Sequence, residues 1–93
     1  MTVATLRLDL RVNQCQTARD RRRQTQAIMD RLHRSFNVAV ADAASVGEAD
    51  RTVLVVATVG RTRRDARLTL ERVADAVAVH PHTELLAQDF TEL

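Results

Sequence analysis

The sequence of 93 residues is poor in residue types on which many binding sites depend. It has no tryptophan, tyrosine or lysine, and its only aromatic side chains are Phe36 and Phe90. We therefore do not expect a sheet that stacks nucleic-acid bases on aromatic residues, as an RNA-recognition motif does. Only two glycines are present, which excludes a glycine-rich phosphate-binding loop.

Cysteine and long apolar runs are equally scarce. The single cysteine, Cys15, excludes an internal disulfide and fits a reducing compartment. The longest fully apolar run, 53–57, is far too short to cross a bilayer. Arg7 and Asp9 interrupt the N-terminal segment where a signal peptide is apolar. We therefore expect a cytoplasmic protein without membrane contact, with residues 1–93 forming a single domain.

Hydrophobic periodicity predicts four strands. Apolar and polar residues alternate in the first and second of them, which is typical of strands with one buried face. The third is apolar on both faces, and Gly47 falls in a polar turn before it. The predicted strands are residues 3–12, 36–41, 52–59 and 83–90.

Two amphipathic helices are predicted between these strands. Each begins after a threonine that is followed three residues later by an aspartate, Thr17 with Asp20 and Thr62 with Asp65. Pro81 ends the second helix. The order βαββαβ with right-handed crossovers gives a ferredoxin-like α+β sandwich. Its antiparallel sheet has the order 4-1-3-2, and both helices cover one face.

The third strand raises the question of what covers the other face of the sheet. Only one of its two apolar sides can meet the helices. We expect an apolar region on the open face and a homodimer formed through it. The alternatives are that a loop covers it or that a monomer tolerates it. The candidate dimer face comprises Ala39, Ala41, Leu54 and Val56.

Basic charge is concentrated near the N-terminus. All fourteen basic residues are arginine, and residues 1–34 carry a net charge of +5, against −3 for residues 35–93. Arginines in the first turns of a helix oppose its dipole, so stability alone does not favour them. Together with free N–H groups of the helix end they predict an anion site. A solvated face paired with nearby acids is the alternative. The candidate RNA- or anion-binding residues are Arg19, Arg21, Arg22, Arg23 and Arg34, and a second basic cluster comprises Arg61, Arg63, Arg64 and Arg67.

No catalytic constellation is found. Cys15 precedes the arginine-rich helix start, a setting that lowers a thiol pKa, but no orienting base accompanies it. His80 and His82 are too few for a zinc site, and we interpret them as partly charged residues at a helix C-terminus. We expect no enzyme activity, no cofactor, no metal and no small-molecule substrate.

Residues 17–42 resemble the signature of the YlxP-like family of small bacterial proteins, a domain of unknown function numbered 503. That signature reads S-L-K-[DE]-K-R-R, then an amphipathic helix, then R-F-N-V-S-V-A-E; here TARDRRR and SFNVAVAD stand in its place. LRLDLRV and RTVLVVATVGRTRRDARLTLERV fit as well, whereas the usual lysines and a tryptophan before the third strand are missing. The resemblance implies a ferredoxin-like fold and no established activity. Genes of the family often neighbour genes for translation and ribosome maturation.

These observations favour a non-enzymatic, cytoplasmic binding protein for structured RNA, in particular ribosomal RNA. The arginine-rich helix start would contact phosphates. The alternative is a homodimeric protein-interaction module that uses the open sheet face and has no nucleic-acid role.

Overall fold

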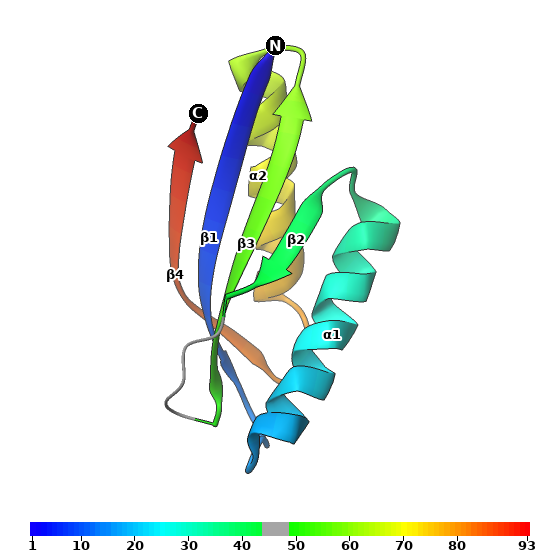
Figure 1. Ribbon diagram of the computed structural model, residues 1–93, viewed down its shortest axis with the longest axis vertical. Helices are drawn as coiled ribbons and strands as arrows, with labels where there is room; N and C mark the ends of the chain where they lie inside the picture. The colour runs from blue at the N-terminus through cyan, green and yellow to red at the C-terminus, as the bar shows by residue number, and fades with distance from the viewer. Residues whose placement is uncertain (44–48) are drawn as a thin grey trace.

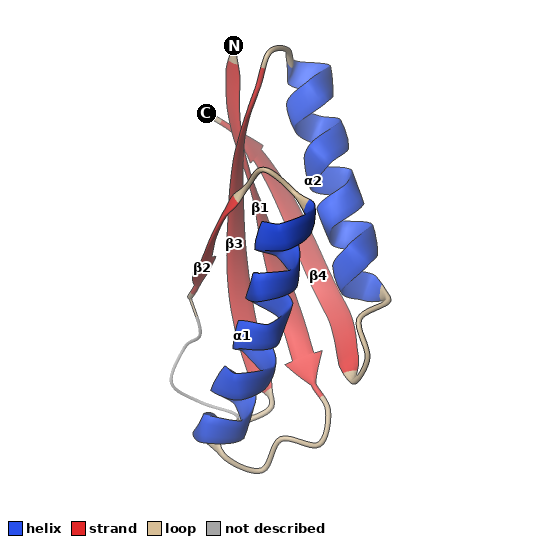
Figure 2. Ribbon diagram, turned by 90° about the vertical axis from the view of Figure 1, so that its right-hand side faces the viewer, coloured by secondary structure: helices blue, strands red, loops and turns tan. Residues whose placement is uncertain are grey.

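The computed structural model describes residues 1–43 and 49–93, and the turn predicted around Gly47 lies outside them. One sheet has the order β2-β3-β1-β4, with all neighbouring strands antiparallel. Both helices lie on one face of it, and they run in opposite directions (Figures 1 and 2). The predicted ferredoxin-like βαββαβ fold is thus confirmed. The elements are β1 (Thr2–Val12), α1 (Ala18–Ser35), β2 (Ala39–Asp42), β3 (Arg51–Gly60), α2 (Arg63–Ala78) and β4 (Thr83–Glu92).

The two helix starts are built alike. Thr17 Oγ1 accepts a hydrogen bond from the N–H of Asp20, and Thr62 Oγ1 accepts one from the N–H of Asp65, each at 3.1 Å. Each threonine has an extended backbone, as an N-cap residue should. Both predicted capping positions are confirmed, although the aspartate side chains make no bond back to the cap.

The core lies between the helices and the inner face of the sheet. β1 supplies alternate residues from Ala4 to Val12, and both helices supply one apolar stripe each. Gly60 lets α2 approach β3, because a Cβ atom there would lie only 2.6 Å from the backbone nitrogen of Ala66. The fully buried helix residues are Thr25, Ile28, Leu32, Ala66, Leu70, Val73 and Val77.

The register of β3 corrects the predicted dimer face. Leu54 lies opposite Leu8 of β1, and Val56 lies opposite Leu6. Residues opposite each other in an antiparallel pair point to the same face, so both β3 residues face the helices, and both are fully buried. Leu54 and Val56 therefore cannot line the open face. The β3 residues that do are Val53, Val55, Ala57 and Val59.

The second strand is shorter than predicted. β2 begins at Ala39 rather than at Phe36, and it pairs with β3 over four residues. Before that point the chain is held by a side chain, because Thr58 Oγ1 donates to the carbonyl oxygen of Asn37 at 3.2 Å. Ala39 and Ala41 are exposed, and they lie opposite open-face residues of β3.

Candidate nucleic-acid interface

α1 presents four exposed arginines on its outer side. At 100° per residue, Arg19, Arg23 and Arg34 fall within about 60° of one another, and Arg22 flanks them. Arg34 lies fifteen positions after Arg19, which corresponds to about 22 Å along the helix axis. Arg21 is half-buried and lies outside this surface. We call the four exposed residues the arginine stripe: Arg19, Arg22, Arg23 and Arg34.

The charge of the arginine stripe is not neutralised by ion pairs. Within residues 1–43 and 49–93, no carboxylate oxygen lies within 4 Å of these four guanidinium groups. Asp30 lies on the same side of the helix, four residues before Arg34, and adds one negative charge there; its Oδ1 accepts a hydrogen bond from Gln26 Nε2 at 2.8 Å rather than from an arginine of the stripe. The alternative of a stripe paired with neighbouring acids therefore finds no support among the described residues.

The amide end of α1 contributes less to this site than expected. The hydroxyl of Thr17 accepts a hydrogen bond from the N–H of Asp20, so this N–H is not available to an external anion. The carboxylate of Asp20 lies in the first turn. That carboxylate already interacts with the positive end of the helix dipole and competes with an external anion. The positive surface thus comes from the side chains of the arginine stripe.

The second basic cluster differs in being partly neutralised. Arg63 Nε donates to Glu92 Oε1 at 2.8 Å, which raises the pKa of Arg63 above its ordinary value. Arg67 Nε donates to Glu71 Oε1 at 3.2 Å, and its guanidinium lies 4.7 Å from the ring centre of Phe90. Arg61 and Arg64 remain exposed. Because the helices run in opposite directions, this cluster lies at the other end of the molecule from the start of α1 (Figure 1).

The surroundings of Cys15 do not lower the pKa of its thiol. Burial and the nearby carboxylates of Asp20 and Asp50 raise the pKa of its thiol, and the opposing effect of Arg21 does not outweigh them. The expectation of a lowered thiol pKa was wrong, because it counted the neighbouring arginines but not the partial burial of Cys15, nor the carboxylates of Asp20 and Asp50.

His80, after the end of α2, also differs from expectation. Burial, Arg31 and His82 together lower the pKa of His80, so the neutral form is favoured rather than a partial positive charge. Arg31 Nη1 lies 3.2 Å from His80 Nδ1. A guanidinium only donates, so Nδ1 accepts this hydrogen bond and the ring proton resides on Nε2. Among the described residues, no three metal-ligating side chains come together.

The fold and this surface define a small α+β domain with a row of exposed arginines on one helix that form no ion pair with the described residues. The chain belongs to the family described as "Protein of unknown function (DUF503)", whose model matches residues 3–90. The resemblance to the domain of unknown function numbered 503 is thereby confirmed. No curated protein matches the chain. In the described part of the chain, no helix is both long and apolar enough to span a membrane.

Proposed function

We propose that this chain is a non-enzymatic, cytoplasmic protein that binds the phosphate backbone of structured RNA through the arginine stripe. The observation that carries this proposal is the set of four exposed guanidinium groups on one side of α1, without ion pairs among the described residues. Guanidinium groups bind phosphate oxygens in a bidentate manner, and an exposed row of them forms an electrostatic footprint for a polyanion.

The proposal is limited to backbone recognition. Phe36 and Phe90, the two aromatic residues of the chain, are both half-buried against the core. They are therefore not available as a platform for unstacked bases. Three of the four charges lie within about 6 Å along the axis at the start of a straight helix, and Arg34 lies about 16 Å further on, so the stripe can reach phosphates at two points of a rigid, regular array. Double-stranded RNA offers such an array, and it is recognised largely by its shape and backbone. The resemblance described above favours ribosomal RNA as its source.

Fluorescence anisotropy with a labelled RNA hairpin tests the proposal. Four phosphate contacts predict that the logarithm of the binding constant falls with the logarithm of salt concentration with a slope of roughly −3 to −4. The double variant Arg19→Glu, Arg23→Glu removes two contacts and adds two repulsive charges. We therefore expect its affinity to fall at least about 100-fold at low salt.

A matched control separates this site from net charge. The double variant Arg64→Glu, Arg72→Glu makes the same charge change at exposed positions of α2. It should retain most of the affinity. Equal losses in both double variants would show that binding is diffuse, and absence of binding at low salt would overturn the RNA proposal. An acidic protein partner would then be sought by pull-down, with bulk RNA as competitor.

A further inference from the structure

Exposed apolar side chains gather at one end of the open sheet face. Val3 lies opposite Val59 in the β1–β3 ladder, and the N–H of Leu93 donates to the carbonyl oxygen of Val3 at 2.9 Å. The chain termini and the end of β3 therefore meet at this end (Figure 1). Six large hydrophobic residues are exposed in the described part of the chain, and four of them lie here: Met1, Val3, Val59 and Leu93.

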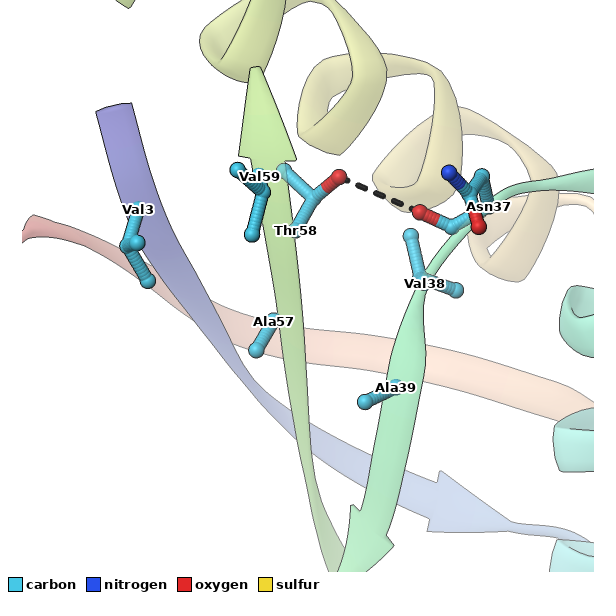
Figure 3. A pocket seen from close by; sticks show the side chains of 7 residues that line it. All are labelled: Val3, Asn37, Val38, Ala39, Ala57, Thr58 and Val59. Atoms are coloured by element: carbon cyan, nitrogen blue, oxygen red, sulfur yellow. Dashed lines mark hydrogen bonds between the residues drawn. The ribbon is translucent and has the colours of Figure 1, made fainter. Parts of the chain in front are cut away.

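The apolar surface continues from this end as a shallow hollow. The hollow, of about 360 Å³, lies between β1, β3 and the segment leading into β2 (Figure 3). Ala39 and Ala57 lie opposite each other, and their small side chains leave space on the open face. The sequence did not predict the hollow or a role for Val59. The alternation within residues 52–59 did indicate that Val59 and Ala57 lie on the same side of the strand. The lining residues are Val3, Asn37, Val38, Ala39, Ala57, Thr58 and Val59.

We propose that the occupant of this face is a second copy of the chain, in a face-to-face dimer with twofold symmetry. The first argument is charge. Beside the apolar region, the open face carries both signs: Arg7 Nε lies 3.4 Å from Asp9 Oδ1, and Asp89 lies opposite Arg7 in the β1–β4 ladder. In a symmetric interface the same surface meets itself, so charged residues in it can pair across the axis when both signs are present. A face for RNA or for an acidic protein would instead carry an excess of positive charge.

The second argument is size. The longer two extents of the molecule are 42 and 22 Å, and the second of them includes α1 beside the sheet (Figure 1), so the open face covers less than roughly 900 Å². A standard interface buries about 800 Å² per partner, so a dimer of this chain would use nearly the whole open face. On that face β2 and β3 form the apolar part, and the charged residues of β1 and β4 lie beside them.

The distribution of apolar residues also restricts the symmetry. A twofold axis across the strands would reverse their direction and place the apolar Val59 end of β3 over the Arg51 end of β3 in the other copy. An axis that runs parallel to the strands above β3 places β3 over β3 with the same direction, so the apolar ends of the two copies meet. The helices then lie outside, and both arginine stripes remain exposed. The dimer is therefore independent of the proposed RNA binding.

Sedimentation equilibrium of the full chain tests the proposal. The same substitution, valine to aspartate, is made in two separate variants at two exposed valines. Val59 is 59% exposed on the open face, and Val79 is 74% exposed after the end of α2. Val59→Asp would bury two unpaired carboxylates in the interface, one from each copy, and should raise the dimer dissociation constant at least about 100-fold. Val79→Asp should leave it unchanged.

A second variant guards against a local effect at Val59. Ala39→Arg places a long charged side chain at an exposed position of β2, two strands away from Val3, and it should also give monomers. Far-ultraviolet circular dichroism should show all variants folded, because every substituted position is exposed. A monomeric wild type at high micromolar concentration, or an unchanged dimer in Val59→Asp, would overturn the proposal. So would capture of a different protein by a monomeric wild type.

Discussion

The start of α1 offers a prediction in which stability and binding change in opposite directions. Arg19 is the second residue of α1, after an N-cap threonine and before an aspartate. Arg64 occupies the same position in α2, with Thr62 and Asp65 around it. Both arginines are exposed. The chain thus contains two equivalent helix starts in which the same substitution can be compared.

The effect on stability follows from the helix dipole. A cation in the first turn is unfavourable and a carboxylate favourable, each by about 0.3–1 kcal/mol. Arg19→Glu and Arg64→Glu should therefore each stabilise the fold by about 1 kcal/mol. Arg19→Glu also replaces the repulsion between residues 19 and 23 by an attraction, which adds about 0.5 kcal/mol. For a chain of this size, 1 kcal/mol corresponds to a rise in Tm of about 4–8 °C.

Thermal unfolding and RNA binding should be measured on the same three proteins. We expect both variants to melt at a higher temperature than the wild type, Arg19→Glu the highest. Only Arg19→Glu should lose RNA affinity, because Arg64 lies outside the arginine stripe. A lower Tm for Arg19→Glu would show that Arg19 stabilises the fold, and the electrostatic argument for an external anion would then be wrong.

Three further predictions concern residues outside the arginine stripe. Gly60→Ala should destabilise the fold by about 1–3 kcal/mol in urea unfolding, because the added Cβ meets the backbone of Ala66; an unchanged midpoint would contradict this. Cys15 should react with iodoacetamide at pH 7 more slowly than glutathione does, since its thiol pKa is raised, and faster reaction would contradict the assignment. Because folding lowers the pKa of His80 below 6.5, the unfolded chain binds its proton first as the pH falls. The contribution of His80 to the free energy of unfolding should be complete above pH 6.5 and should be lost as the pH falls towards the folded-state pKa. The variant His80→Gln should therefore show a smaller change of the unfolding free energy with pH in that range.

The fold was predictable because local signals agreed with one another. Strict alternation in β1 fixed which of its residues are buried, and the caps at Thr17 and Thr62 fixed both helix starts. The handedness of the two crossovers then left one strand order. The faces of β3 were not predictable in this way. Both of its sides are apolar, so periodicity carries no information, and only the pairing of Leu54 with Leu8 decides which side meets the helices.

In the candidate site, too, local sequence predicts some features and tertiary contacts decide the others. Helical spacing alone placed Arg19, Arg23 and Arg34 on one outer side, and the structure agrees with their exposure. The partners that neutralise the second cluster depend on tertiary contacts. Arg63 meets Glu92, which is 29 residues away in the sequence, and no local pattern indicates this pair. The raised thiol pKa of Cys15 likewise depends first on its partial burial in the fold, and Asp50, distant in the sequence, adds a smaller effect.

The two proposed surfaces lie on opposite sides of one sheet, and this makes each of them testable alone. A dimer formed through the open face directs its two arginine stripes outward, away from each other. One short RNA helix should therefore contact one stripe, and Val59→Asp should leave its affinity unchanged. An RNA with two helices far enough apart to reach both stripes should bind the dimer more tightly through effective concentration, by up to about 100-fold. That gain should disappear in Val59→Asp, whereas Arg19→Glu should weaken binding to both RNAs without changing the dimer.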